Sequence, residues 1–143
     1  MNPEETLYSL LAWKLQTLDI KYFTAAELLV KTDVPPNSLP SETLLDNILP
    51  TVKILDKLRF TIKKPIIIIS GYRNDAYNRR VGGSKLSQHK EFKALDFTCD
   101  DLYVAWRTLT IWRRDGMFKG GIGRYSTFIH LDTRNRNATW GPR

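Results

Sequence analysis

Residues 87–97, SQHKEFKALDF, place a histidine in a loop that runs into a strand-like segment. Side chains alternate between the two faces of an extended segment. Asp96 therefore points to one face, and its apolar neighbours Leu95 and Phe97 point to the other, where they can pack on a core. The stretch is either half of a metal site that uses His89, or a surface histidine ahead of a buried strand.

The other histidine of the chain lies in a second strand-like segment, FIHLDTR, residues 128–134. There His130 and Asp132 share one face, and Ile129 and Leu131 share the opposite, core-facing one. Two neutral imidazoles and a carboxylate, with a fourth position open for water, form a ligand set that catalytic zinc uses. The spacing alone leaves this set open beside the alternative of two hydrogen-bonded histidines.

The remaining pattern predicts an α+β fold with one small antiparallel sheet flanked by helices. Four isoleucines in residues 63–70 indicate a central strand, because a strand that is apolar on both faces is buried on both. Residues 74–89 are expected to form a long ordered loop, and the glycines of 119–124 a turn before the last strand. Four helices are predicted: one from near Pro3, a short one after Thr24, one from Ser41 to Leu58, and one over 101–115. Thr24 and Glu27 form a capping box for the second helix, and Pro50 is expected to kink the third.

The length of 143 residues suits one domain, 1–143, with residues 1–20 as an appended N-terminal helix. No segment approaches the roughly 18 consecutive apolar residues of a membrane span, so no membrane insertion is expected. Acids precede the first apolar run and no cleavage site follows it, which predicts cytoplasmic synthesis without a signal peptide.

The formal net charge of +7 favours an anionic partner, such as nucleic acid, a membrane surface or a cell-wall polymer. The charge does not choose among these partners. The basic residues are also scattered along the chain, so an ordinary solvated surface is the alternative.

The blocks SGYR, VGGSKLSQH, ALDF, GGIGRY, FIHLDTR and ATWG follow one another between Phe23 and Trp140. In this order they resemble the zinc D-alanyl-D-alanine peptidases, the cell-wall carboxypeptidases and endopeptidases whose fold is shared with the hedgehog signalling domain. The resemblance implies that fold for most of the chain, and it leaves the first 20 residues outside.

The resemblance also implies roles for individual residues. Zinc would be held by His89, Asp96 and His130, with water in the fourth position. Arg73 would hold a carboxylate or carbonyl of the peptide substrate, for which a guanidinium group is well shaped. A structural salt bridge at a strand end is the alternative for Arg73. Ser87 would fix the loop and the substrate backbone near the metal.

The chain departs from the family pattern near the metal. Many members carry an acid three residues before the last histidine ligand, where this chain has Thr127. Asp132 is the candidate replacement as general base, and its alternative role is to orient a histidine ring.

A family glycine is replaced by Phe92, so either the turn is rebuilt or substrate access is altered. The adjacent Glu91 is an extra acid that either reaches the site or stays solvated.

We therefore expect a zinc metallopeptidase, a D,D- or L,D-carboxypeptidase or endopeptidase, that cleaves peptidoglycan stem or cross-bridge peptides. Its size and predicted lack of a signal resemble phage wall-degrading enzymes, which act after release or as part of a virion. The alternative is a non-catalytic structural or binding module of the same fold, with phage structural proteins as partners; Phe92 and Thr127 favour it. The ordered peptidase blocks argue against a third function, a metal-dependent nuclease, so nucleic acid is not the expected partner.

Overall fold

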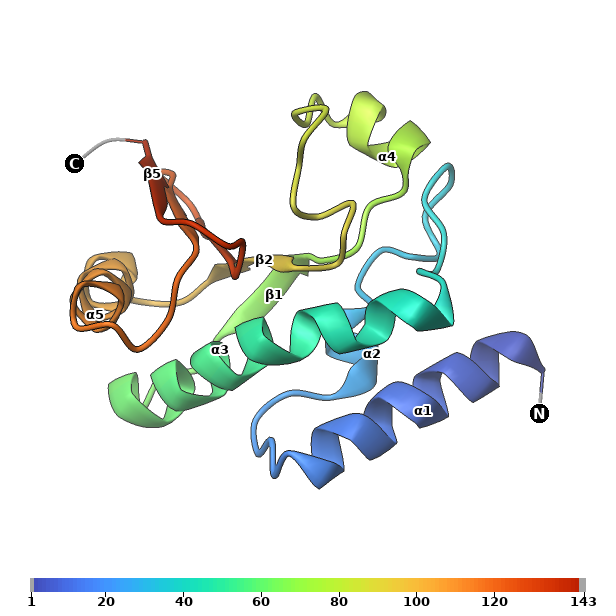
Figure 1. Ribbon diagram of the computed structural model, residues 1–143, viewed down its shortest axis with the longest axis horizontal. Coiled ribbons are helices and arrows are strands. Elements are labelled where there is room, and N and C mark those ends of the chain that lie inside the picture. Colours follow the sequence, from blue (N-terminus) through green and yellow to red (C-terminus); the bar gives the residue numbers. More distant parts are fainter. Residues whose placement is uncertain (1, 142–143) are drawn as a thin grey trace.

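The structure, a computed structural model, describes residues 2–141. A five-stranded sheet is flanked by helices, which confirms the predicted α+β class (Figure 1). The helical segments are α1 (Pro3–Thr17), α2 (Ala25–Leu28), the 3-10 helix η1 (Glu42–Ile48), α3 (Leu49–Ile62), α4 (Asp75–Arg80) and α5 (Leu102–Arg114). The strands are β1 (Ile67–Ser70), β2 (Ala94–Thr98), β3 (Gly121–Arg124), β4 (Ile129–Asp132) and β5 (Ala138–Trp140).

The strands follow the order β1-β2-β4-β3-β5 across the sheet. The pairs β1–β2, β2–β4 and β3–β4 are antiparallel, whereas β5 runs parallel to β3. The sheet is thus mostly antiparallel, as predicted, with one parallel pair that the sequence did not indicate. Figure 1 shows α1 and α3 on one side of β1 and β2, and α4 with the loop after it on the other side.

The pairing of β2 with β4 positions the residues of interest. Asp96 lies opposite His130, and Leu95 lies opposite Leu131. Both leucines are fully buried in the hydrophobic core, so the apolar and polar residues of the two strands separate onto opposite faces, as the alternation predicts. One face of this strand pair therefore packs on the core, and the other presents ionisable side chains.

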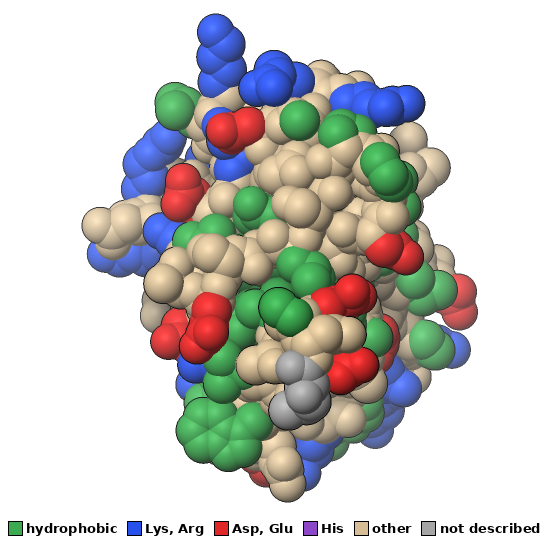
Figure 2. Space-filling model, turned by 90° about the vertical axis from the view of Figure 1, so that its right-hand side faces the viewer, with side chains coloured by type: hydrophobic (Ala, Val, Ile, Leu, Met, Phe, Trp, Pro, Cys, Tyr) green, Lys and Arg blue, Asp and Glu red, His purple; other side chains and the backbone are tan. Residues whose placement is uncertain are grey.

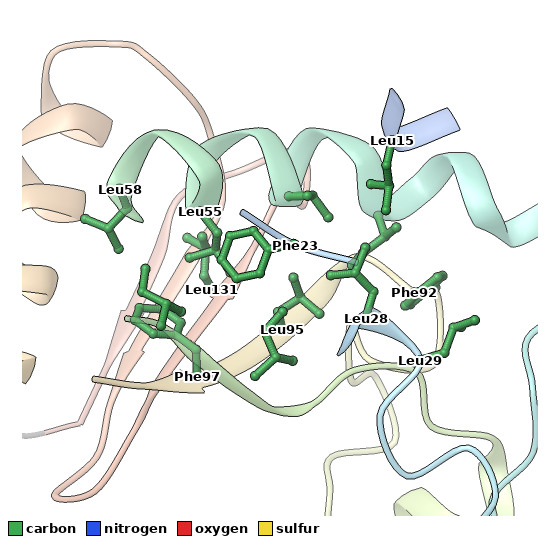
Figure 3. Close-up of a cluster of buried hydrophobic side chains, with 14 of the residues drawn as sticks. Leu15, Phe23, Leu28, Leu29, Leu55, Leu58, Phe92, Leu95, Phe97 and Leu131 are labelled. Carbon is green, nitrogen blue, oxygen red and sulfur yellow. The ribbon is translucent and has the colours of Figure 1, made fainter. Parts of the chain in front are cut away.

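The core is one cluster of buried hydrophobic side chains, part of which Figure 3 shows. The helix α1, predicted as an appended element, contributes Leu7, Leu11 and Leu15 to this cluster. Each buried leucine of this kind stabilises the fold by roughly 1.5–3 kcal/mol. Removal of α1 would therefore expose part of the same core that supports β2 and β4.

The helix starts follow their capping residues. Asn2 caps α1, because its side-chain oxygen accepts a hydrogen bond from the backbone N–H of Glu5. The capping box of Thr24 and Glu27 at α2 is present as predicted. The helix predicted from Ser41 to Leu58 is divided instead into η1 and α3, and Pro50 lies in the first turn of α3, where its missing N–H costs nothing.

Three further predicted elements differ from the structure. The isoleucine strand β1 lies at an edge of the sheet, and Ile67 is 59% exposed, so the prediction of a central strand was wrong. The predicted loop 74–89 contains α4, which Asn74 caps. The glycine segment predicted as a turn forms β3, because Gly121 and Gly123 leave room for large neighbouring side chains on the strand.

Phe92 keeps the backbone conformation that a glycine would favour. Its φ angle is +52°, in the left-handed region, and its N–H donates to the carbonyl of His89 in a tight turn. The ring is fully buried in the core cluster (Figure 3) and contacts Tyr72 edge-on, with the ring centroids 6.1 Å apart. Burial of the ring compensates for the strained backbone, so this chain accommodates a phenylalanine at a positive φ.

The surface carries charges of both signs. On the face in Figure 2, Lys and Arg side chains lie mainly along the edges, whereas acidic and hydrophobic side chains occupy the middle. This face therefore has no single large basic patch. Within residues 2–141, no helix has the length and apolar character that crossing a membrane requires.

We predict opposite effects of glycine at two buried phenylalanines. Phe92→Ala should lower the free energy of unfolding by about 3–5 kcal/mol, because a ring is lost from the core. Phe92→Gly should cost roughly 1 kcal/mol less than Phe92→Ala, because glycine adopts a positive φ without strain. Urea denaturation of both variants measures the difference.

The matched control is Phe97, which is also fully buried but lies in the extended strand β2. There Phe97→Gly should be more destabilising than Phe97→Ala, because glycine weakens a strand interior. If Phe92→Gly were also the less stable of its pair, backbone strain at Phe92 would be disproved.

Candidate metal centre

Three predicted ligands meet at one buried point. His89 at the end of the loop after α4, Asp96 in β2 and His130 in β4 are 2%, 5% and 7% exposed. One potential ligand atom from each residue lies within 4.8 Å of the others. Two strands and one loop thus bring together residues that are far apart in the sequence.

The hydrogen bonds of the two rings show which nitrogens are free to bind a metal. Nδ1 of His89 lies 2.7 Å from the carbonyl oxygen of Gly71, which can only accept, so Nδ1 carries the hydrogen. Nε2 of His130 lies 2.7 Å from Oδ2 of Asp132 and donates to it. The opposite nitrogens, Nε2 of His89 and Nδ1 of His130, each face Oδ1 of Asp96 at 3.1 Å.

This arrangement fits a divalent cation. In neutral rings of these tautomers, both nitrogens that face Asp96 present lone pairs to a carboxylate oxygen, which also only accepts. Three acceptors that converge in a buried place repel one another unless a proton or a cation lies between them. Two imidazoles and one carboxylate with an open fourth position are the donor set of catalytic zinc.

The pKa shifts of the site favour a charged aspartate and a neutral His89. Burial raises the pKa of Asp96, but its close interactions with the rings of His130 and His89 outweigh burial and hold the pKa well below its usual range. Burial lowers the pKa of His89. For His130 burial also lowers the pKa, but bonding to Asp132 and Asp96 raises it overall, so a metal competes with a proton at this ring.

Asp132 has the contacts of a residue that orients His130. It has no exposed surface. Its Oδ1 accepts hydrogen bonds from the backbone N–H groups of Gly121 and Arg134 and from Nε of Arg134, and its Oδ2 accepts from Arg134 and His130. A general base must reach the substrate. Of the two roles predicted for Asp132, these contacts favour orientation of the ring.

The three ligands form part of the lining of a pocket of about 330 Å³. The other lining residues come from the loop between β1 and α4, the loop after α4 and the β3–β4 connection: Arg73, Val81, Gly82, Gly83, Ser84, Tyr125 and Phe128. Asp96 is the one carboxyl-bearing residue in this lining. Thr127 and Glu91 are exposed and are not part of it, so the extra acid at Glu91 stays solvated.

Arg73 lies against the ligand Asp96. Its Nη2 donates to Oδ2 of Asp96 at 3.2 Å, its Nε donates to Oγ of Ser70, and its Nη1 donates to Oδ1 of Asn78. A guanidinium group has five N–H donors, so within residues 2–141 two of them remain for a ligand in the pocket. Both predicted roles of Arg73, the salt bridge and the substrate contact, are compatible with this geometry.

Ser87 lies in the loop before His89, where it is predicted to fix the loop and the substrate backbone. Its Oγ accepts a hydrogen bond from the backbone N–H of His89, which stabilises the loop as expected. The pocket lining contains Ser84 in place of Ser87. Contact of Ser87 with a substrate stays a prediction.

Trp140 is a neighbour of the site to which sequence reasoning assigned no role. Its indole lies 4.9 Å from the ring of His130, between centroids, and the guanidinium of Arg134 lies 5.3 Å from the indole centroid. A Cβ atom on Gly123 would lie 2.4 Å from the indole nitrogen. Glycines at the alternate positions 121 and 123, followed by a tryptophan at position 140, are the signal that the sequence offers.

Comparison with models of known protein families identifies a family for this chain. The family model described as Peptidase M15 matches residues 21–132, which is most of the chain and includes all three predicted ligands. No curated protein is similar enough to the chain to count as a match.

We predict that Asp132→Asn weakens Zn²⁺ binding by about 10–100-fold, because the ring of His130 loses its charged partner. Competition with a chromophoric zinc chelator measures the dissociation constant. The matched control is Asp115→Asn, which changes an exposed aspartate at the end of α5 and should leave zinc affinity unchanged. Wild-type affinity in Asp132→Asn, combined with lost turnover, would contradict the orienting role and support the role of general base.

Proposed function

Since the chain belongs to the Peptidase M15 family, whose members are zinc-dependent metallopeptidases, we propose that it cleaves the stem or cross-bridge peptides of peptidoglycan. The observation that carries this proposal is the buried convergence of His89, Asp96 and His130 in the lining of a pocket. As part of the same proposal, the protein acts as a phage-type wall-degrading enzyme, after release from the cell or within a virion.

The zinc ion would be held by Nε2 of His89, Oδ1 of Asp96 and Nδ1 of His130. When bound, zinc polarises a peptide carbonyl and lowers the pKa of a bound water to about 7. The chain keeps the ligands in the required state: Gly71 and Asp132 accept the hydrogen of the far ring nitrogen, so each ring presents a lone pair to the pocket.

Arg73 would bind the substrate. Its guanidinium lines the pocket and stays fixed by Asp96, Ser70 and Asn78, with donors left for a carbonyl or terminal carboxylate of the peptide. Because the guanidinium is already fixed, it loses little side-chain entropy when the substrate binds. A fixed donor also helps to hold the peptide in the orientation that the reaction requires. The same contact to Asp96 couples the substrate position to the ligand set.

One observation favours the second candidate, a zinc-binding module without catalysis. Among the residues that line the pocket, Asp96 is the one carboxyl group, and Asp132 lies out of contact with the pocket. A pocket without a second acid offers no evident carboxylate base for the attacking water. Both functions require one bound metal ion per chain. The peptidase should cleave peptide, whereas the zinc-binding module should not.

We predict about one zinc per chain in wild-type protein and almost none in His130→Ala, because a ligand is lost. Wild-type protein should also release new amino termini from purified peptidoglycan, and His130→Ala should release none. Elemental analysis and an amine-labelling assay measure the two quantities. The control is Thr127→Ala, which changes an exposed residue close to His130 and should alter neither result.

The outcomes separate the candidates. Zinc in the wild type without released amino termini would contradict the peptidase and support the module. Turnover that survives His130→Ala would contradict the ligand assignment, and protein without zinc would contradict both functions.

A further inference from the structure

Two aromatic residues in the β3–β4 connection line the pocket beside the candidate ligands. The rings of Tyr125 and Phe128 are stacked, with centroids 4.3 Å apart and planes at 8°. The backbone N–H of Tyr125 donates to the carbonyl of Phe128, which closes the turn. Tyr125 is nevertheless 41% exposed, so its ring is held on one side and accessible on the other.

The hydroxyl group of Tyr125 has a fixed partner. Nε1 of Trp140 donates a hydrogen bond to Oη of Tyr125 at 2.8 Å. An indole N–H can only donate, so the phenol oxygen accepts this bond and its own hydrogen remains for another acceptor. The tyrosine therefore brings an oriented O–H donor to the pocket that His89, Asp96 and His130 also line.

Trp140 is held in place by several neighbours at once. β5 pairs with β3 so that Trp140 lies opposite Gly123, where a side chain would collide with the indole. The guanidinium of Arg134 lies over the indole, and Arg134 is itself bound to Asp132. The position of the Tyr125 hydroxyl thus depends on the same group of residues that orients His130.

The other donors of the lining have different constraints. Arg73 is tied to Asp96. Ser84 is exposed, and its Oγ accepts a hydrogen bond from the backbone of Leu86 within its own loop. Tyr125 combines exposure to the pocket with a side-chain partner that fixes its oxygen, which is the arrangement expected of a donor prepared for a ligand.

We propose that Tyr125 is a substrate-binding residue whose hydroxyl donates a hydrogen bond to a carbonyl oxygen of the bound peptide, and that Trp140 is its positioning residue. The inference rests on the proposed peptidase function, because the peptide is the ligand. It adds a donor on the β3–β4 connection to the one that Arg73 supplies.

Tyr125→Phe tests the donor, because it keeps the ring stacked on Phe128 and removes the hydroxyl. The probe is a purified cross-linked muropeptide dimer, which contains both stem and cross-bridge peptide bonds. In zinc-loaded protein we expect Tyr125→Phe to weaken binding of the dimer about 5–10-fold, the value of one hydrogen bond, and to lower kcat/KM by at least that factor. Zinc content should equal that of the wild type. The control is Tyr103→Phe, an exposed tyrosine of α5, which should change nothing.

Trp140→Phe and the double variant test the positioning role. Trp140→Phe removes the N–H that holds the hydroxyl, and it should weaken binding of the dimer by a smaller factor than Tyr125→Phe. Because Trp140 acts on binding through the hydroxyl, the double variant should bind as Tyr125→Phe does. If the double variant lost as much affinity as the product of the two single losses, the positioning role would be overturned. That result would mean that Trp140 affects binding independently of the Tyr125 hydroxyl.

The outcomes for the inference and for the proposed function differ. Equal binding and equal kcat/KM in wild type and Tyr125→Phe would overturn the inference while the peptidase stands. Wild-type protein that binds the dimer without cleaving it would contradict the peptidase, and the binding constants of the variants would still decide the inference. Wild-type protein that neither binds nor cleaves the dimer would overturn both.

Discussion

Three electron-pair acceptors, two imidazole nitrogens and one carboxylate oxygen, face one another inside the protein. Nε2 of His89 and Nδ1 of His130 both face the same oxygen of Asp96, and their opposite nitrogens are already committed to Gly71 and Asp132. Neutral rings cannot relieve this arrangement by rotation without loss of a buried hydrogen bond, which costs roughly 1–3 kcal/mol. A bound cation removes the conflict, and the fold keeps the acceptors together because β2 and β4 pair Asp96 directly with His130.

Residues around the ligands restrict the geometry further. Asp132 fixes the ring of His130, and β3 approaches closely because Gly121 and Gly123 have no side chains to collide with Asp132 and Trp140. On the other side, the turn after His89 is held by Phe92, whose buried ring stabilises a backbone conformation that is unfavourable for phenylalanine. A phenylalanine can therefore occupy a left-handed position when its side chain points into the core.

Much of this could be predicted from the sequence, because alternation along a strand is a local property. The shared face of Asp96 and His130 follows from parity alone, and the structure brings both to His89 as expected. Sheet order is a non-local property. The four isoleucines give no sign that β1 lies at an edge with Ile67 exposed. The glycines of β3 predict a turn, because their partner Trp140 lies in a strand that follows much later in the sequence. Which ring nitrogen faces the metal also depends on neighbours, such as the Gly71 carbonyl, that no sequence pattern identifies.

The division of the site between two parts of the chain has a consequence for specificity. The family match ends at Asp132, so it contains the three candidate ligands and the connection with Tyr125, whereas Arg134 and Trp140 lie beyond it. β5 joins the sheet through its parallel pairing with β3, whereas the pairing of β2 with β4 sets the ligand register. The indole of Trp140 in β5 lies against the ring of His130. Substitutions at Trp140 can therefore move Tyr125, through the bond to its hydroxyl, while β2 and β4 still pair Asp96 with His130. Substitutions at Arg134 would also disturb Asp132, which orients the ring of His130. Within such an arrangement, the choice of substrate can change with less effect on the metal site than a change in β2 or β4 would have.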